Sequence, residues 1–189
     1  MSVLTLERPT TTTKQLVEQL YRTEGKAEII NGEIVKFMAT GDEPSSAAFN
    51  IAVSLKLYQK NLGNGRTYTD NVGFLVNLPN RKSFSPDVSF FTGNRSGMKF
   101  LQGAPIFAVE VRSENDYGKT AEREMAEKRA DYFAAGTKIV WDVDLLSEEI
   151  IKSYSADNPE TPKIYKRGEI ANAEPALPNW EIAVDELFD

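Results

Sequence analysis

Residues 105–113 read Pro105-Ile106-Phe107-Ala108-Val109-Glu110-Val111-Arg112-Ser113, an almost continuous apolar run that ends in charged residues. Such a run is typical of a central β-strand that is covered on both faces. Because side chains alternate along a strand, Glu110 and Arg112 would share one face with Ile106 and Ala108. A carboxylate in these surroundings is costly unless it is paired or binds a metal. Glu110 is therefore either a site residue or the point at which the strand emerges into solvent, and both readings stay open.

The segments around this run predict a mixed sheet flanked by helices, an α/β (α+β) fold in a single domain. Asn31-Gly32, between two β-prone runs, predicts a hairpin because both turn residues accept positive φ. Segment 94–103 is predicted to be a loop. Periodicity and capping predict helices at 14–21, 44–60, 117–135 and 180–188. Strands are predicted at 28–30, 33–35, 68–70, 73–78, 87–91, 106–111, 139–144, 149–154 and 163–165. Residues 1–13 are predicted to be a flexible leader, and residues 14–189 the domain.

The composition excludes several kinds of chemistry. The 189 residues include no histidine and no cysteine, so serine–histidine and thiol catalysis, imidazole metal sites, disulfides and zinc–thiolate sites are all excluded. What remains is carboxylates, lysines, arginines, hydroxyls and backbone groups, with a hard cation such as Mg²⁺. The chain has no apolar run of about 18 residues, which predicts no membrane span and a cytoplasmic protein.

The charge balance bears on nucleic-acid binding. With 22 basic and 28 acidic residues, the formal charge is −6, which argues against non-specific binding to phosphates. The local balance differs, because residues 81–99 contain one acid, Asp87, and four bases: Arg81, Lys82, Arg95 and Lys99. These bases predict either a basic rim around an acidic site or an ordinary solvated loop.

Asp87 is a second carboxylate at the end of an apolar strand. It follows Pro86 and precedes the β-prone residues 88–91. If this strand lies beside the one ending at Glu110, the two carboxylates would be close, and their repulsion would raise one pKa or recruit a divalent cation. Taken alone, an aspartate after a proline is also an ordinary turn residue.

Lys128 is a cation within an apolar stripe of the predicted helix at 117–135. On a helical wheel it falls among Ala121, Met125, Tyr132 and Ala135. This position directs it toward the core or a site. A pair with Glu124 at i, i+4, or a side chain that lies along the stripe with its amine in solvent, would also explain it. Arg129 lies near the same face, so the wheel does not single out Lys128.

Together these segments resemble the Uma2 family, a large group of bacterial proteins that is especially abundant in cyanobacteria. The resemblance covers about residues 24–166. It is carried by Glu28-Ile29-Ile30-Asn31-Gly32-Glu33-Ile34-Val35, Ser85-Pro86-Asp87-Val88, Ala104-Pro105, Val109-Glu110-Val111-Arg112-Ser113, Glu127-Lys128-Arg129, Tyr132, Ala135-Gly136, Trp141 and Val143-Asp144. It implies the restriction-endonuclease-like, PD-(D/E)XK fold. It also implies an Mg²⁺-dependent endonuclease, with Mn²⁺ as a substitute, that acts on nucleic acid, in the first place DNA, and forms a homodimer.

The resemblance also implies roles for single residues. Pro86-Asp87 matches the "PD", Glu110 matches the first acid of the "(D/E)XK", and Arg112 stands where the lysine is expected. In the family the lysine's role is thought to have moved to the position of Lys128. The implied catalytic residues are Asp87, Glu110, Lys128 and Arg112. The implied metal ligands are Asp87, Glu110, the carbonyl of Val111 and Glu33, with Glu28 as a less certain one.

Other features of the chain leave room for different functions. Many relatives carry a histidine near residues 46–49, and this chain has none. The fold does not fix function, so a non-catalytic binding or assembly protein would retain the same segments. The same acids would also suit a metal-dependent phosphohydrolase that acts on small nucleotides.

Overall fold

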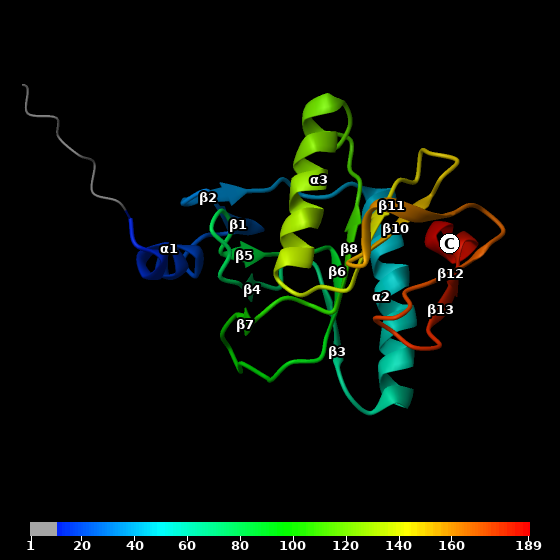
Figure 1. Cartoon of the computed structure of the whole chain (residues 1–189), viewed down its shortest axis with the longest axis horizontal. Coiled ribbons are helices and arrows are strands. Elements are labelled where there is room, and N and C mark those ends of the chain that lie inside the picture. Colours follow the sequence, from blue (N-terminus) through cyan, green and yellow to red (C-terminus); the bar gives the residue numbers. More distant parts are fainter. Residues whose placement is uncertain (1–10) are drawn as a thin grey trace, which may run out of the picture.

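A six-stranded mixed sheet forms the centre of the molecule, as the computed structural model of residues 11–189 shows (Figure 1). Its strands, in spatial order, are β11 (Asn158–Tyr165), β10 (Ile151–Ser155), β9 (Ile139–Val143), β8 (Phe107–Val111), β6 (Val88–Phe91) and β3 (Arg66–Thr69). Neighbours are antiparallel except β8 and β9, which are parallel. A parallel pair needs a crossover, and α3 (Lys119–Ala134) provides it. The apolar run 106–111 therefore forms a central strand, as its composition predicts.

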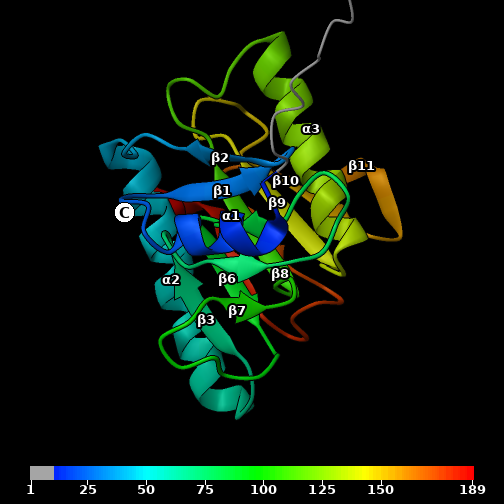
Figure 2. The same cartoon turned by 90° about the vertical axis from the view of Figure 1, so that its left-hand side faces the viewer.

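The two long helices cover opposite faces of this sheet (Figure 2). α2 (Asp42–Leu62) packs Ile51 and Leu55 against side chains such as Val109 and Trp141 in the larger apolar core. α3 contributes Tyr132 to a second core, which includes Ala108 of β8. Because successive residues of β8 alternate between these cores, Glu110 lies on the α3 face of the sheet.

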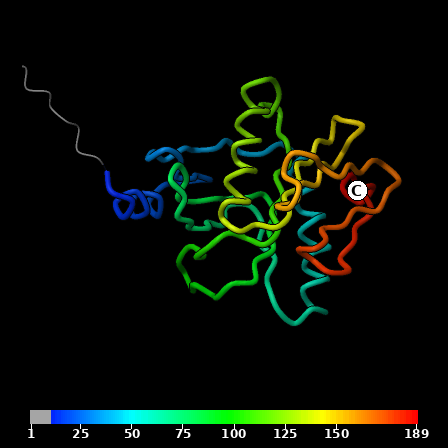
Figure 3. Tube along the Cα trace, in the orientation of Figure 1, coloured from blue at the N-terminus to red at the C-terminus, as the bar shows by residue number. Residues whose placement is uncertain are grey.

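Smaller elements lie at the two ends of the long axis (Figures 1 and 3). At one end, α1 (Thr13–Leu20) packs beside the hairpin of β1 (Ala27–Ile30) and β2 (Glu33–Lys36). At the other end, β12 (Ile170–Asn172) pairs with β13 (Glu181–Ala183), which leads into the 3₁₀ helix Val184–Phe188. A small sheet has the order β5 (Ser83–Phe84), β4 (Phe74–Leu75), β7 (Leu101–Gln102).

The β1–β2 hairpin is attached to the segment that leads into β6. Its turn residues Asn31 and Gly32 have φ of 50° and 79°, as the sequence predicts. The amide of Ile29 donates to Ser83 Oγ at 2.8 Å, and the Lys82 amide donates to the Ile29 carbonyl at 2.9 Å. These bonds hold β1 beside residues 80–83, and therefore close to the start of β6.

The mixed sheet flanked by helices in a single domain confirms the predicted fold class. Some local predictions are wrong. Residues 101–102 of the predicted loop form β7, and β5 was not predicted, because a two-residue strand shows no periodicity of its own. The predicted helix at 180–188 begins instead as β13. None of the helices in residues 11–189 is long and apolar enough to cross a membrane.

The predicted leader lies mostly outside the described residues, which begin at 11. Its last part belongs to α1. The Thr12 hydroxyl accepts the Gln15 amide at 3.3 Å, and the Gln15 side chain accepts the Thr12 amide at 2.8 Å. This capping box starts the helix at Thr13 rather than Lys14.

Candidate functional site

Asp87 and Glu110 lie across from each other on neighbouring strands. Val88 of β6 pairs with Val109 of β8 in antiparallel register, so the next residues outward are Asp87 and Glu110. The Asp87 amide donates to the Val109 carbonyl at 3.2 Å, and Asp87 Oδ2 accepts the Val111 amide at 2.8 Å. The sequence predicted that Asp87 and Glu110 lie close together if their strands are neighbours, and β6 and β8 are neighbours.

The carbonyl of Val111 is directed to the same side of β8 as Asp87. The amide and the carbonyl of one strand residue point to the same side, and the Val111 amide points at Asp87. One backbone oxygen and two carboxylates are thus available at this end of β6 and β8.

α3 places a cation and a hydroxyl over Glu110. Lys128 Nζ lies 2.8 Å from Glu110 Oε1, and the Tyr132 hydroxyl donates to the same oxygen at 2.6 Å. Lys128 and Tyr132 are four residues apart, so they share a helix face. The Lys128 side chain is only 16% exposed. Its carboxylate partners come from the sheet and from β1, rather than from Glu124 on its own helix.

Glu28 of β1 is a third carboxylate in this cluster, and it is completely buried. Glu28 Oε1 accepts the Ser85 amide at 2.9 Å and lies 3.2 Å from Lys128 Nζ. Arg81 forms an ion pair with Glu28 and also binds Asp131 Oδ2 at 2.8 Å. These contacts connect the hairpin and α3 to the segment that carries Asp87 and leads into β6.

Lys26, directly before β1, is the second lysine of the cluster. Its Nζ lies 2.5 Å from Asp87 Oδ1 and 2.8 Å from Asp70 Oδ1. The Lys26 side chain is 13% exposed, and its carbonyl accepts the Phe37 amide at 2.9 Å. The structure therefore pairs each acid at the ends of β6 and β8 with a lysine. We call Lys26, Glu28, Asp87, Glu110 and Lys128 the carboxylate–lysine cluster.

The charges of this cluster shift its pKa values in different directions. Burial raises the pKa of Glu110, and the negative charges of Asp87 and Glu28 add to that rise, while Lys128 offsets only part of it. Burial would also raise the pKa of Glu28, but Lys128 and Arg81 lower it below its ordinary value. The pKa values of Glu110 and Glu28 are therefore shifted in opposite directions, although both carboxylates contact Lys128.

Both lysines stay protonated. Burial lowers the pKa of Lys128, but the charges of Glu110 and Glu28 raise it by more, so it lies above its ordinary value. The pKa of Lys26 is raised in the same way, against burial, by Asp87 and Glu110. Lys128 therefore acts as a fixed positive charge rather than as a proton acceptor.

Comparison with known proteins identifies the family of this chain. Residues 14–185 match the model of Uma2, whose description is "Putative restriction endonuclease". The chain belongs to the Uma2 family. No curated protein matches it. The chain resembles a crystal structure from Anabaena variabilis ATCC 29413, described as "a putative nuclease belonging to DUF820", with a TM-score of 0.70 and 15% identity over 91% of this chain and 96% of that chain. At this identity the likeness shows the fold alone.

Arg112 of this Uma2 protein does not reach the carboxylate–lysine cluster. Arg112 Nε and Nη2 donate to the two Asp142 oxygens, both at 2.8 Å, and its Nη2 also donates to Glu122 at 3.1 Å. These hydrogen bonds raise the pKa of Arg112. Its strong contacts lie between β8, β9 and α3, so the packing gives Arg112 a structural position and does not bring it to the cluster as predicted.

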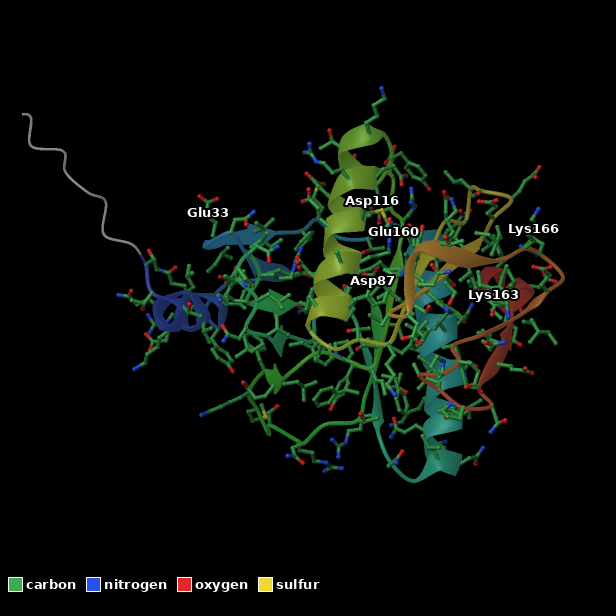
Figure 4. All side chains as sticks on the ribbon, viewed as in Figure 1. Glu33, Asp87, Asp116, Glu160, Lys163 and Lys166 are labelled. Atoms are coloured by element: carbon green, nitrogen blue, oxygen red, sulfur yellow. The ribbon has the colours of Figure 1, made fainter. Side chains whose placement is uncertain are left out.

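Glu33, a predicted metal ligand, lies away from the cluster. It is exposed at the start of β2, far from Asp87 (Figure 4). Glu28, rather than Glu33, is the glutamate of the hairpin that lies in the cluster. The two residues are five apart and on opposite strands of the hairpin, so the sequence alone did not decide which of them faces the sheet.

The predicted basic rim is also incorrect in part. Arg81 is only 5% exposed and binds Glu28 and Asp131, so it belongs to the interior. The Lys82 ammonium donates to the Leu78 carbonyl at 2.6 Å, whereas the segment 92–95 is exposed. Arg81 therefore does not contribute to an exposed basic rim.

The sequence analysis missed Lys26 altogether, and it named Tyr132 as part of the apolar stripe and of the family resemblance but gave it no role in the site. A signal for Lys26 did exist, because it lies two residues before Glu28 at the entry to an apolar strand, and residues at i and i+2 share a strand face. Although three carboxylates lie in the cluster, no group of three or more acidic side chains in the described part of the chain is arranged so that these side chains alone could hold a metal ion.

Proposed function

We propose that this Uma2 protein is a nuclease that needs a divalent cation, Mg²⁺ or Mn²⁺, to hydrolyse phosphodiester bonds, with DNA as the expected substrate. Its membership of a family described as "Putative restriction endonuclease" supports the reaction class. The observation that carries the proposal is the meeting of Asp87, Glu110 and Lys128, from two strands and a helix, on one face of the sheet. These three residues are 23 and 18 positions apart in the sequence, so only the fold brings them together.

The residues fit a hard cation with one condition. Asp87, Glu110 and the Val111 carbonyl offer only oxygen donors, which Mg²⁺ and Mn²⁺ prefer. Burial is the main cause of the raised pKa of Glu110, and the negative charges of Asp87 and Glu28, which the lysines offset only in part, add to it. The condition is that Lys26, now 2.5 Å from Asp87 Oδ1, gives up that oxygen.

The residues of the site would have different roles in hydrolysis. Asp87, Glu110 and Val111 would hold the ion, and Tyr132 would fix the Glu110 carboxylate through its hydrogen bond. When bound, a divalent cation neutralises negative charge that develops on the scissile phosphate. Lys128, permanently charged and held by Glu110 and Glu28, would stabilise the phosphate oxygens electrostatically.

One observation favours a second candidate, a non-catalytic binding protein with the same fold. Asp87 and Glu110 each already have a lysine partner, at 2.5 Å and 2.8 Å, so the cluster is stable without a metal. A protein that had lost the metal would keep this arrangement. The two functions differ in whether the cluster binds a divalent cation at all.

Thermal unfolding with millimolar Mn²⁺ separates the two candidates. The nuclease proposal expects Mn²⁺ to raise the melting temperature, because a ligand that binds only the folded state stabilises it. Asp87→Asn should abolish the increase, and Glu160→Gln, an exposed acid on β11, should retain it. A melting temperature that does not respond to Mn²⁺ in the wild type would favour the binding protein.

Hydrolysis assays then identify the substrate. DNA, RNA and small nucleotides are incubated with wild type, Asp87→Asn and Glu160→Gln in the presence of Mg²⁺ or Mn²⁺. Cleavage of polymeric DNA that Asp87→Asn lacks supports the proposal. Hydrolysis of small nucleotides alone would instead indicate a phosphohydrolase. A homodimer and a cytoplasmic location stay predictions from the family and the sequence.

A further inference from the structure

Lys26 joins two carboxylates that differ in burial. The Asp87 side chain is 12% exposed, and the Asp70 side chain, in the turn after β3, is 49% exposed. The Lys26 ammonium lies 2.5 Å from the first and 2.8 Å from the second. One cation is therefore already shared between a buried acid of the site and an acid at the surface.

We propose that Lys26 occupies the position on Asp87 that a divalent cation takes, and that binding of the cation transfers the ammonium group from Asp87 to Asp70. This inference rests on the metal site of the proposed function. It adds a positioning residue, Lys26, that acts on the metal through Asp87.

The geometry allows this transfer without movement of the main chain. Asp87 Oδ2 is held by the Val111 amide, so Oδ1 is the oxygen left for a cation, and Lys26 now binds it. The Lys26 backbone is anchored, because its carbonyl accepts the Phe37 amide. Its four-carbon side chain can still change rotamer, and a small displacement is enough since the ammonium already contacts Asp70.

The same contacts favour transfer of the ammonium group to Asp70. An ammonium group and a divalent cation on one carboxylate oxygen repel each other strongly at this range. Asp70 keeps the displaced ammonium paired, which lowers the cost of the exchange.

The arrangement has a functional consequence. Without metal, Lys26 keeps the buried Asp87 compensated, so the folded protein does not depend on the ion. With metal, binding occurs only in competition with a tethered ammonium group, which weakens the affinity for the ion. Lys26 therefore sets the divalent-cation concentration at which the site fills.

Lysine labelling of the full-length wild type tests the movement. The acetylation rates of Lys26 and of Lys166, an exposed lysine far from Asp87, are measured by mass spectrometry with and without Mn²⁺ (Figure 4). We expect Mn²⁺ to accelerate the labelling of Lys26 severalfold and to leave Lys166 unchanged, because the ammonium group moves toward the surface. Bound ions ordinarily protect nearby side chains, so faster labelling is specific to displacement.

Calorimetric titration with Mn²⁺ tests the competition. Lys26→Met should bind Mn²⁺ at least about tenfold more tightly than wild type, since a positive charge in contact with the ligand oxygen is removed. Lys166→Met should bind as wild type does. Circular dichroism of Lys26→Met checks that it is folded, and the labelling experiment does not depend on this variant.

The outcomes separate the inference from the nuclease proposal. Mn²⁺ binding with unchanged or slower Lys26 labelling would overturn the displacement, as would equal affinities of Lys26→Met and wild type. Failure of both proteins to bind Mn²⁺ would overturn it together with the metal site. Faster labelling and tighter binding by the variant, in a protein that cleaves no nucleic acid, would support the displacement and reject the nuclease.

Discussion

Replacement of Arg112 by methionine distinguishes a structural guanidinium from a catalytic one. Arg112 is 7% exposed, and its partner Asp142 is 2% exposed. Methionine fills a similar volume but leaves Asp142 buried with one weaker partner, Arg129, at 3.4 Å. We therefore expect Arg112→Met to destabilise the protein without affecting the binding of a divalent cation.

The expected loss follows from the burial of the pair. Removing one partner of a buried ion pair costs roughly 3–5 kcal/mol, because the other charge stays desolvated. Arg129 compensates in part, so we expect about 3 kcal/mol for Arg112→Met, the lower end of that range. For a domain of this size, about 1 kcal/mol corresponds to roughly 2–4 °C, so the melting temperature should fall by roughly 6–12 °C.

A double-mutant cycle measures the pair itself. Arg112→Met, Asp142→Asn and the double variant are unfolded in urea, and their free energies of unfolding are compared with wild type. The double variant should be more stable than the sum of the single losses predicts, because it leaves no unpaired buried charge. Mn²⁺ should raise the melting temperature of all four proteins.

Two results would refute this reasoning. The first is an Arg112→Met protein whose free energy of unfolding lies within about 0.5 kcal/mol of wild type, the range of an ordinary surface substitution. The second is a variant of wild-type stability that has lost Mn²⁺ binding or nucleic-acid cleavage. The first result would overturn the structural role, and the second would return Arg112 to the catalytic role that its sequence position suggests.

Four further predictions concern the cluster, the β1–β2 hairpin and the core. Glu28→Gln should cost about 3 kcal/mol near neutral pH, as Arg81 and Lys128 lose a buried partner. The fold lowers the pKa of Glu28, so the stabilisation by its carboxylate is fully present above pH 4.5 and is lost as the pH falls through the pKa of the folded state. Urea unfolding should therefore show that the difference in free energy of unfolding between Glu28→Gln and wild type becomes smaller in acid. Glu33→Gln, at an exposed position, should change stability by less than about 0.5 kcal/mol in the same assay. Tyr132→Phe should lose about 2 kcal/mol in chemical denaturation, the value of a hydrogen bond to a charged group. Gly65→Ala should lower the melting temperature by several degrees, since φ is +74° and the added carbon would overlap the buried Phe90 ring.

Much of the fold could be predicted because its main signals are local. The apolar run 106–111 indicated a buried strand, and Asn31-Gly32 indicated a hairpin, since both depend only on residues next to one another in the chain. The small sheet was predicted only in part: the predicted strand at 73–78 contains β4, but β5 and β7 could not be predicted, because each is two residues long and is defined by its partners.

The candidate site was predictable only in outline. Charges at the ends of apolar strands drew attention to Asp87 and Glu110, and the helical stripe to Lys128. Which cation serves the site was not predictable. Arg112 is two residues from Glu110 on the same strand, and Lys128 is on the helix that follows, so the sequence left both as candidates. Only the packing of α3 places Lys128 beside Glu110 and Arg112 beside Asp142.

The amino-acid sequence alone determined which chemistry is available, because without histidine and cysteine only oxygen ligands and fixed cations remain. It also determined the order of the longer strands and helices, since apolar periodicity is a property of neighbouring residues. Tertiary structure alone decided the partners: Lys26 with Asp87, Glu28 with Arg81, and Arg112 with Asp142. A buried charge is stable only beside a complementary charge, and that partner can come from any segment that the fold brings within reach.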